Sequence, residues 1–336
     1  MKKINVWMLS ILLFVAVFTG CKKDETTPTP TPVNESELLA TYLESTNSPL
    51  GKDYVNTDMP SVITATDVYT LNQTNQIYII DIRNKGDYDT LGHIQNAVQV
   101  PLANLLTHIK GVNLANYTKV AIVCYTGQTA GFGALLLRLM GYDKVFSMKW
   151  GMCSWNTKFA AKWNNSVSNT YATQFTTTAS PKAAAGSLPT LTTGKTTGQE
   201  ILEARVNALL TEGFGAASVT NATVFGALNN YYIVNYWPEA QYNLGHIPGA
   251  IQYTPKASIK LAADLKTLPT NKPIAVYCYT GQTSAYLSAY LRLLGYDAKS
   301  ILFGTNGMAF DFMTTNNITP TFTAAEIKGY NYVQTK

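Results

Sequence analysis

The chain repeats itself, and this internal repeat limits what it can fold into more than any other feature does. The hexapeptide Cys-Tyr-Thr-Gly-Gln-Thr occurs unchanged at residues 124–129 and 278–283, an offset of 154 residues. Two flanking blocks recur in the same order, Gly-His-Ile upstream and Arg-Leu-Met/Leu-Gly-Tyr-Asp downstream. Three matched blocks in one order indicate a duplicated domain. A chain of 336 residues holds about two domains of ordinary size.

Each copy alternates apolar runs with helical patterns. Helices are predicted at 130–140 and 284–294, and each ends at a Gly-Tyr-Asp turn whose glycine can cap it. Strands alternating with helices predict an α/β protein with two domains, each a parallel sheet flanked by helices on both faces. Both repeated cysteines fall at the carboxyl end of a predicted strand, where such sheets bind ligands. The apolar runs of the first copy, typical of buried parallel strands, are 77–82, 120–124 and 144–148.

The N-terminus predicts export and lipid attachment. Two lysines precede an apolar stretch at 6–18, which is shorter than the about 20 residues that span a bilayer. Residues 1–20 resemble a bacterial lipoprotein signal that is cleaved before Cys21, whose thiol is then lipidated. An ordinary secretory signal with an incidental cysteine is the alternative. We therefore expect a lipid-anchored protein of the bacterial cell envelope, attached to the outer membrane at its inner or its surface-exposed face.

Composition divides the rest of the chain. Residues 21–35 are rich in Thr and Pro and predict a flexible tether. Residues 164–198 are rich in Thr, Ser, Ala, Gly and Pro with few charges, which predicts a linker that could in part pack along both domains. The two domains are then expected at 36–163 and 199–336.

The charge pattern excludes several classes of function. Only 13% of the residues are charged, the formal net charge is +5, and no basic run interleaves with aromatic residues. Nucleic acid is therefore not expected as a partner. The three histidines and four cysteines show no metal-ligand spacing, and no phosphate-binding loop occurs. We predict neither a metal nor a cofactor.

The position of the cysteines suggests anion chemistry. Where a strand ends and a helix begins, loop amides and the helix N-terminus can point at the sulfur and favour a thiolate. A free thiol has a pKa of about 8.5, and the helix dipole lowers it by about one unit at most. Hydrogen bonds from the loop amides must supply the rest. We expect Cys124 and Cys278 to be thiolates in a cradle of backbone donors, with no general base.

These motifs together resemble the rhodanese sulfurtransferases. The second copy carries Gly-His-Ile-Pro-Gly-Ala at 245–250, the first carries Asp-x-Arg at 81–83, and both carry Cys-x-x-Gly-x-Thr. The resemblance covers about 60–160 and 218–315 and implies two rhodanese-like domains. It also implies a persulfide cycle, in which the cysteine takes sulfane sulfur from thiosulfate, a persulfide or a polysulfide. The sulfur then passes to a thiophilic acceptor such as a thiol or cyanide.

The resemblance assigns roles to particular residues. Cys124 and Cys278 would be the catalytic nucleophiles. The residues that would bind the persulfide or substrate, mostly through loop amides, are Tyr125, Thr126, Gly127, Gln128, Thr129, Tyr279, Thr280, Gly281, Gln282, Thr283 and Arg83.

Departures from the family pattern narrow the chemistry. The second copy has Asn-Tyr-Trp at 235–237 in place of Asp-x-Arg, and neither loop holds a Lys or Arg. A neutral loop is expected to bind the thiosulfate dianion weakly, which favours a persulfide or polysulfide donor. Related phosphatases have one more loop residue and an arginine six after the cysteine. Here those positions are Ala130 and Ser284, so a phosphoryl group would lack its bidentate clamp.

Several residues have simpler interpretations. We align Cys153 with Ala309 of the second copy and interpret it as a small packed residue rather than a resolving thiol. We interpret His93 and His246 as structural hydrogen-bonders. Arg83 either contacts substrate or pairs with Asp81.

Two other classes of function stay open. One is a non-catalytic envelope module that binds sulfide species or a protein. The other is a redox pair of Cys124 and Cys278, which requires their Cα atoms to lie within about 7 Å.

Overall fold

The computed structural model describes residues 34–335. The predicted signal, the lipidation site Cys21 and nearly all of the tether lie outside these residues. Within them, no helix is both long enough and apolar enough to cross a bilayer.

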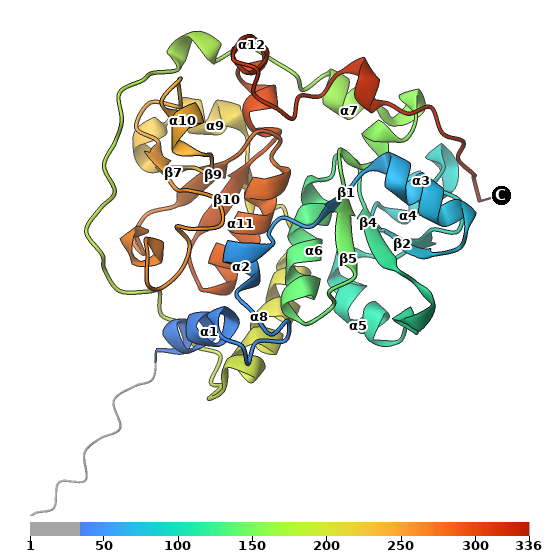
Figure 1. Cartoon of the computed structure of the whole chain (residues 1–336), viewed down its shortest axis with the longest axis horizontal. Coiled ribbons are helices and arrows are strands. Elements are labelled where there is room, and N and C mark those ends of the chain that lie inside the picture. Colours follow the sequence, from blue (N-terminus) through green and yellow to red (C-terminus); the bar gives the residue numbers. More distant parts are fainter. Residues whose placement is uncertain (1–33, 336) are drawn as a thin grey trace, which may run out of the picture. The chain divides into compact units, whose positions relative to one another are not determined.

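Each copy of the repeat forms a five-stranded parallel sheet, as the sequence predicts (Figure 1). The second and fourth strands of each copy lie at the middle of the sheet, and the β4–β2 and β9–β7 pairs are in parallel register. The first sheet has the order β1-β5-β4-β2-β3, with β1 (Val62–Ile63), β2 (Ile77–Asp81), β3 (Val98–Gln99), β4 (Lys119–Val123) and β5 (Val145–Met148). The second has the order β6-β10-β9-β7-β8, with β6 (Ser218–Val219), β7 (Tyr232–Asn235), β8 (Ile251–Gln252), β9 (Ile274–Tyr277) and β10 (Ala298–Ile301).

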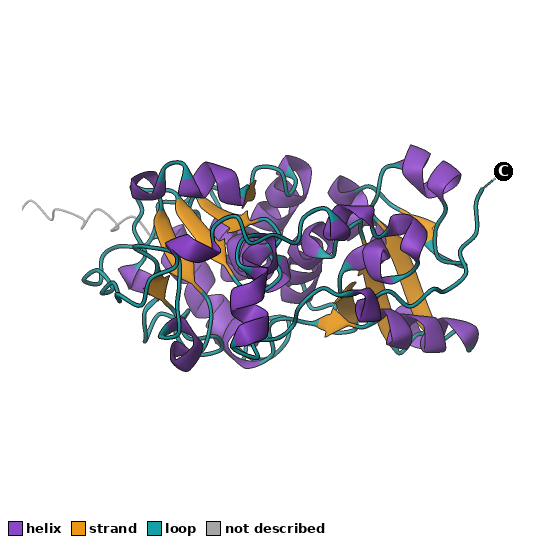
Figure 2. Ribbon diagram, turned by 90° about the horizontal axis from the view of Figure 1, so that it is seen from above, coloured by secondary structure: helices purple, strands orange, loops and turns teal. Residues whose placement is uncertain are grey.

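Helices cover both faces of each sheet (Figure 2). The helix after each cysteine begins two residues earlier than predicted, because Gly127 and Gly281 adopt left-handed backbone angles (φ 88° and 76°) and cap it. The helices are α1 (Glu35–Glu44), α2 (Tyr54–Thr57), α3 (Ala65–Gln73), α4 (Lys85–Leu91), α5 (Leu105–Lys110), α6 (Gln128–Leu139), α7 (Ala161–Asn164), α8 (Gly198–Glu212), α9 (Asn221–Phe225), α10 (Glu239–Tyr242), α11 (Gln282–Leu293) and α12 (Phe310–Thr315).

The largest hydrophobic core is continuous across the two copies. Helices α6 and α11 lie side by side between the two sheets (Figures 1 and 2). Their facing residues, such as Leu136 and Leu287, are fully buried in one cluster with residues of α1 and α8. Phe132 of α6 packs on Phe214, with ring centroids 5.7 Å apart. The two copies therefore share one core and do not hang separately on a linker.

The N-terminal helix α1 belongs as much to the second copy as to the first. It packs on α8, and the Ser36 hydroxyl donates to the carbonyl of Leu294 at 2.7 Å. The Glu35 carboxylate accepts from the amide and the hydroxyl of Thr193, both at 2.7 Å. Although the sequence assigns this helix to the first domain, its contacts tie the start of the chain to the second.

The segment that follows each sheet crosses to the other copy. Thr176, in the expected linker, pairs antiparallel with His246, and Val333, near the C-terminus, pairs antiparallel with His93. Leu188 and Leu191 of the expected linker are buried in the shared core. The linker therefore packs along the protein, which is the alternative that its composition left open.

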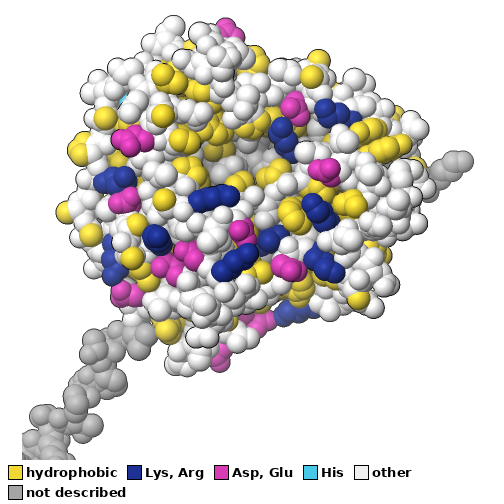
Figure 3. Space-filling model, in the orientation of Figure 1, with side chains coloured by type: hydrophobic (Ala, Val, Ile, Leu, Met, Phe, Trp, Pro, Cys, Tyr) yellow, Lys and Arg dark blue, Asp and Glu magenta, His cyan; other side chains and the backbone are white. Residues whose placement is uncertain are grey.

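The surface reflects the low share of charged residues. On the face in Figure 3, the Lys, Arg, Asp and Glu side chains are scattered singly or in small opposite-charge groups among uncharged atoms. Exposed ion pairs, such as Lys110–Glu203 at 2.6 Å, occur among the described residues.

Candidate functional site

Both repeated cysteines lie at the carboxyl end of the central strand of a sheet. Cys124 follows β4 and Cys278 follows β9, each one turn before a helix, as the sequence predicts. Both side chains are enclosed, because Cys124 is only 2% exposed and Cys278 only 1% exposed. Neither thiol forms a disulfide.

The sulfur of Cys124 faces backbone donors. The amide of Gly127 donates to Sγ at 3.1 Å and the amide of Ala130 at 3.3 Å. Gly127 is one of the predicted donors. Ala130, in the first turn of α6, lies one residue beyond the predicted loop and was missed. A cradle that continues into the first helical turn follows from the helix's free N-terminal amides.

The pKa of Cys124 shifts in the direction opposite to the sequence-based expectation. Burial raises the pKa of this thiol above its ordinary value, and the amides of Ala130, Thr126 and Gly127 lower it by less. Burial of the enclosed sulfur therefore opposes the resting thiolate that the sequence predicts. Desolvation of the anion outweighs the hydrogen bonds that favour it.

The second cysteine has a different set of partners. Its Sγ accepts from the amide of Ser284 at 3.3 Å and donates to the hydroxyl of the same residue at 3.5 Å. That hydroxyl also contacts the hydroxyl of Ser300 at 2.8 Å. Ser284 corresponds to Ala130 of the first copy, so the two sites differ by one hydroxyl group beside the sulfur.

Arg83 is paired rather than free. Its Nε and Nη2 donate to the Asp81 carboxylate at 2.6–3.0 Å, Nη2 also donates to the Gly92 carbonyl, and the side chain is fully buried. This is the second of the two interpretations that the sequence allowed. Nη1 is buried without a partner among the described residues. In the second copy Trp237 takes this place and stacks on Tyr279 with centroids 5.2 Å apart.

Aromatic side chains enclose the region between the two loops. Trp150, Trp163, Phe303 and Phe322 form a cluster, named here the interloop aromatic cluster, with ring centroids 4.7–5.3 Å apart. The indole Nε1 of Trp163 donates to the carbonyl of Thr126 at 3.0 Å. This cluster therefore contacts the first cysteine loop directly and helps to exclude solvent from it.

The predicted substrate-binding residues do not all face the sulfurs. The hydroxyl of Tyr125 bonds to Asp87, and that of Tyr279 bonds to Gln241. Thr129 and Thr283 are half-buried on the first helical turns. The side chains of Gln128 and Gln282 enter the opposite copy, and Nε2 of Gln128 also donates to the hydroxyl of Thr126 in its own loop at 3.1 Å.

The alignment of Cys153 with Ala309 is also wrong. The amide of Cys153 donates to the carbonyl of Tyr125, and the amide of Asn306 donates to the carbonyl of Tyr279 in the same way. This hydrogen-bond register pairs Cys153 with Asn306, three residues before Ala309. The Cys153 thiol donates to the carbonyl of Phe159 at 3.1 Å, and burial raises its pKa to about 11.

The two turn histidines are structural, as predicted. The ring of His93 stacks on Tyr88 at 3.6 Å and bonds to its carbonyl at 3.0 Å. His246 repeats both contacts with Tyr242, at 3.6 Å and 2.8 Å. Neither ring is bonded to a cysteine among the hydrogen bonds of the described residues.

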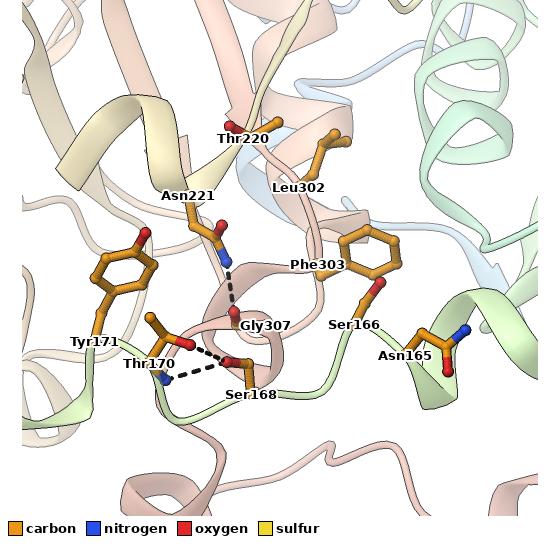
Figure 4. Close-up of a pocket in the computed structure, with 10 residues that line it drawn as sticks. All are labelled: Asn165, Ser166, Ser168, Thr170, Tyr171, Thr220, Asn221, Leu302, Phe303 and Gly307. Atoms are coloured by element: carbon orange, nitrogen blue, oxygen red, sulfur yellow. Dashed lines mark hydrogen bonds between the residues drawn. The ribbon is translucent and has the colours of Figure 1, made fainter. Parts of the chain in front are cut away.

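Two cavities occupy equivalent places beside the sheets, away from the sulfurs. One of about 310 Å³ lies where the crossing segment passes the end of β10 (Figure 4), and its lining contains neither cysteine and no charged side chain. The other, of about 250 Å³, lies beside β5 and contains Lys149, Glu326 and Lys328. The uncharged cavity is lined by Asn165, Ser166, Ser168, Thr170, Tyr171, Thr220, Asn221, Leu302, Phe303 and Gly307.

Comparison with known proteins agrees with this architecture. The family model of the rhodanese-like domain matches twice, at residues 64–158 and 227–309. The chain is 30% identical over 84 residues to the thiosulfate sulfurtransferase GlpE of Pseudomonas fluorescens, covering 25% of this chain and 74% of that protein. It is 25% identical over 79 residues to the adenylyltransferase and sulfurtransferase uba4 of Ogataea parapolymorpha, covering 24% of this chain and only 20% of that protein.

Two solved structures that match the chain are similar to about a quarter of its length. A rhodanese-related protein from Thermoplasma volcanium is 21% identical and covers 27% of this chain and 86% of its own, with a TM-score of 0.24. A rhodanese-like domain protein from Staphylococcus aureus is 22% identical and covers 27% and 87%, also with a TM-score of 0.24.

Proposed function

The chain belongs to the rhodanese-like family, and from that premise we propose that it is a sulfurtransferase that carries sulfane sulfur as a persulfide on Cys124. The observation that supports this most is the pair of amides, from Gly127 and Ala130, that face the sulfur at 3.1 Å and 3.3 Å. These donors can stabilise an anionic sulfur without a general base. The first copy offers two such amides and no side-chain hydroxyl at Ala130.

The proposed cycle has two displacements. The Cys124 thiolate attacks the sulfane sulfur of a donor, an S–S bond forms at Cys124, and the donor's S–S bond breaks with release of its thiolate. An acceptor thiolate then attacks the outer sulfur of the cysteine persulfide, which forms the acceptor persulfide and returns Cys124 as a thiolate. The net reaction moves one sulfur atom and needs no external oxidant or reductant.

The charges near the loop favour a singly charged donor. The guanidinium of Arg83 is already neutralised by Asp81 and the loop itself contains no cation, although the ammonium of Lys162 lies over the ring of Tyr125, 4.8 Å from its centroid. A persulfide or polysulfide would therefore bind more readily than the thiosulfate dianion. Because Cys124 is 2% exposed, the donor reaches it only when the loop or its aromatic cover opens. Opening also rehydrates the sulfur, which lowers the cost of forming the thiolate.

One observation favours a second candidate function. Both sulfurs are enclosed, and the thiol of Cys278 is held by the Ser284 hydroxyl, which fits a non-catalytic module that binds a sulfide species or a protein. Intact-mass analysis separates the two candidates. After incubation with glutathione persulfide, and separately with thiosulfate, sulfur transfer predicts that the protein gains the mass of one sulfur atom at each reactive cysteine and that Cys124→Ser loses the gain at position 124. A protein that never gains sulfur from either donor would exclude the enzyme and leave the binding module.

We further propose that the protein is held in the bacterial cell envelope by a lipid on Cys21. The signal-like residues 1–20 and the Thr/Pro-rich stretch that follows support this location. The full-length chain is expected to incorporate labelled palmitate in cells and to partition into detergent, and Cys21→Ser is expected to do neither. A wild-type chain that is cleaved but carries no label would indicate an ordinary secretory signal instead.

A further inference from the structure

We infer that Gln128 and Gln282 are positioning residues that act across the interface, each supporting the cysteine loop of the opposite copy. Each glutamine belongs by sequence to one Cys-Tyr-Thr-Gly-Gln-Thr loop, but its side chain is buried against the other loop (2% and 4% exposed). The chemical consequence rests on the proposed sulfur transfer, whereas the contacts that follow do not depend on it.

Gln128 supports the backbone beneath Cys278. Its Oε1 accepts from the amide of Phe303 at 2.8 Å. Phe303 adopts a left-handed conformation (φ 63°), and the next residue, Gly304, packs so closely against the second cysteine loop that a Cβ there would collide with the carbonyl of Cys278. The amide of Thr305 then donates to that same carbonyl at 3.0 Å.

Gln128 also touches the second loop itself. A Cβ atom added to Gly281 would collide with Oε1 of Gln128, so the glutamine side chain fills the space beside this glycine. Gly281 is the left-handed residue that begins α11 (φ 76°). A single side chain of the first copy therefore contacts both the loop that carries Cys278 and the turn that underlies it.

Gln282 makes the equivalent contacts with the first copy, but as a hydrogen-bond donor rather than as an acceptor. Its Nε2 donates to the hydroxyl of Ser147 at 2.7 Å and to the carbonyl of Met148 at 3.3 Å. Two residues after Met148 the chain turns through Trp150, at φ 63°, into Gly151, which packs beneath the first cysteine loop as Gly304 does beneath the second. The amide of the following residue, Met152, donates to the carbonyl of Cys124 at 2.9 Å.

The Gln282 side chain also borders the glycine of the first loop. Its Cδ would lie 3.1 Å from a Cβ on Gly127, the residue whose amide donates to the sulfur of Cys124. Across the interface Gln128 thus acts as an acceptor and Gln282 as a donor, while Nε2 of Gln128 also donates to Thr126 of its own loop at 3.1 Å. Each cysteine loop is therefore bordered by a glutamine of the other copy.

The reactivity of each cysteine should therefore depend on the glutamine of the other copy. Gln128→Ala leaves the Phe303 amide buried without its acceptor, and Gln282→Ala removes the donor to Ser147 and Met148. Loss of one buried hydrogen bond corresponds to a change of about tenfold. Gln128→Ala is expected to lower sulfur uptake at Cys278 about tenfold more than at Cys124, and Gln282→Ala is expected to do the reverse.

The experiment compares the two cysteines within one molecule. Full-length protein with both cysteines present is treated briefly with glutathione persulfide, and the ratio of persulfide at Cys278 to persulfide at Cys124 is read by peptide mass spectrometry. A general loss of stability changes both sites, whereas the inference predicts opposite shifts of the ratio in the two variants. Gln73→Ala, an exposed glutamine on α3, is the matched control and should leave the ratio unchanged.

Conservative variants test the polarity of the contacts. Gln128→Glu retains an acceptor oxygen and should restore much of the ratio, whereas Gln282→Glu lacks the donor and should not. The inference would be overturned if the ratio stayed at the wild-type value in both alanine variants. It would also be overturned if each variant lowered sulfur uptake mainly at the cysteine of its own loop. If neither cysteine takes up sulfur, the proposed function fails, but the same ratio measured with iodoacetamide still decides whether the glutamines act across the interface.

Discussion

The thiol of Cys278 donates a hydrogen bond to the hydroxyl of Ser284 across 3.5 Å, and the first copy cannot make this contact because Ala130 stands in the equivalent place. This hydrogen bond must break before the sulfur of Cys278 can attack a donor. The two sites therefore share a loop sequence but differ in the hydrogen-bonding groups beside the sulfur.

Exchanging the residue at this position between the two copies should make the rates of sulfur uptake at the two cysteines more alike. Ser284→Ala removes the acceptor and is expected to raise the rate of sulfur uptake at Cys278 about threefold, the equivalent of one weak hydrogen bond. Ala130→Ser should lower the rate at Cys124 by a similar factor. Site-resolved mass spectrometry after a short exposure to glutathione persulfide measures both rates. Equal rates in wild type and variants would show that the hydroxyl has no influence.

The raised pKa of Cys124 predicts a particular dependence on pH. Only the thiolate attacks, and burial moves its formation to higher pH than for a free thiol of about 8.5. Alkylation of Cys124 by iodoacetamide should therefore keep increasing as the pH rises past that value. The alkylation rate between pH 6 and 10, measured in the Cys278→Ser background, checks this. A plateau at neutral pH would instead mean that the loop amides prevail over burial.

Removing one charge of the buried Asp81–Arg83 ion pair should destabilise the protein. Asp81→Asn leaves the fully buried guanidinium of Arg83 without its counterion and is expected to destabilise the protein by about 3–5 kcal/mol in urea unfolding. The double variant Asp81→Asn, Arg83→Met should recover most of that loss, because no buried charge remains. Asp89→Asn breaks the more exposed Lys85–Asp89 pair and serves as the control, with little change in stability expected.

Glu44 predicts a dependence of stability on pH. Burial raises the pKa of its carboxyl to about 7, and nearby Asp53 adds to the effect, although the amide of Leu261 and the charge of Lys260 oppose it. Between pH 4.5 and 7 the unfolded chain loses this proton while the folded protein keeps it, so stability falls as the pH rises through this range.

Glu44→Gln should remove that dependence. Because the carboxyl is only partly buried, we expect the variant to be more stable than wild type by about 1–2 kcal/mol at pH 8. The two proteins should match at pH 4, where both carry a neutral side chain. Urea unfolding across this range measures the effect, and parallel curves for the two proteins would contradict it.

A single copy should not fold by itself. Removal of the second copy takes away α11, which packs on α6, and exposes the fully buried ring of Phe132 that packs on Phe214. A protein of residues 34–163 also loses the crossing segment that pairs with His93. We expect it to be insoluble or to melt at least about 10 °C below the whole chain, because it loses the core that the two copies share and exposes an apolar surface. A monomeric, cooperatively folded fragment with a similar melting temperature would rule this out.

Local sequence determined much of the fold. The apolar runs at 77–82 and 120–124 coincide with β2 and β4, and Gly127 and Gly281 mark the starts of α6 and α11. These features depend on residues close to one another in the chain, such as a buried strand followed by a left-handed glycine. The repeated loop also predicted that both cysteines lie at the carboxyl ends of strands, which the structure confirms.

Only the tertiary structure decided how those loops behave. Burial of Cys124 raises the pKa of its thiol, the direction opposite to the expectation from the loop alone. The same loop also receives a hydrogen bond from Trp163, which comes after it in the chain. Gln128 looks like a loop residue in sequence, but it bonds to Phe303 because α6 and α11 pack together. A local motif specifies which groups a loop contains. Which of them meet solvent or the opposite copy is set by contacts between residues far apart in the chain, such as Thr126 with Trp163 and Gln128 with Phe303, and these have no local signature.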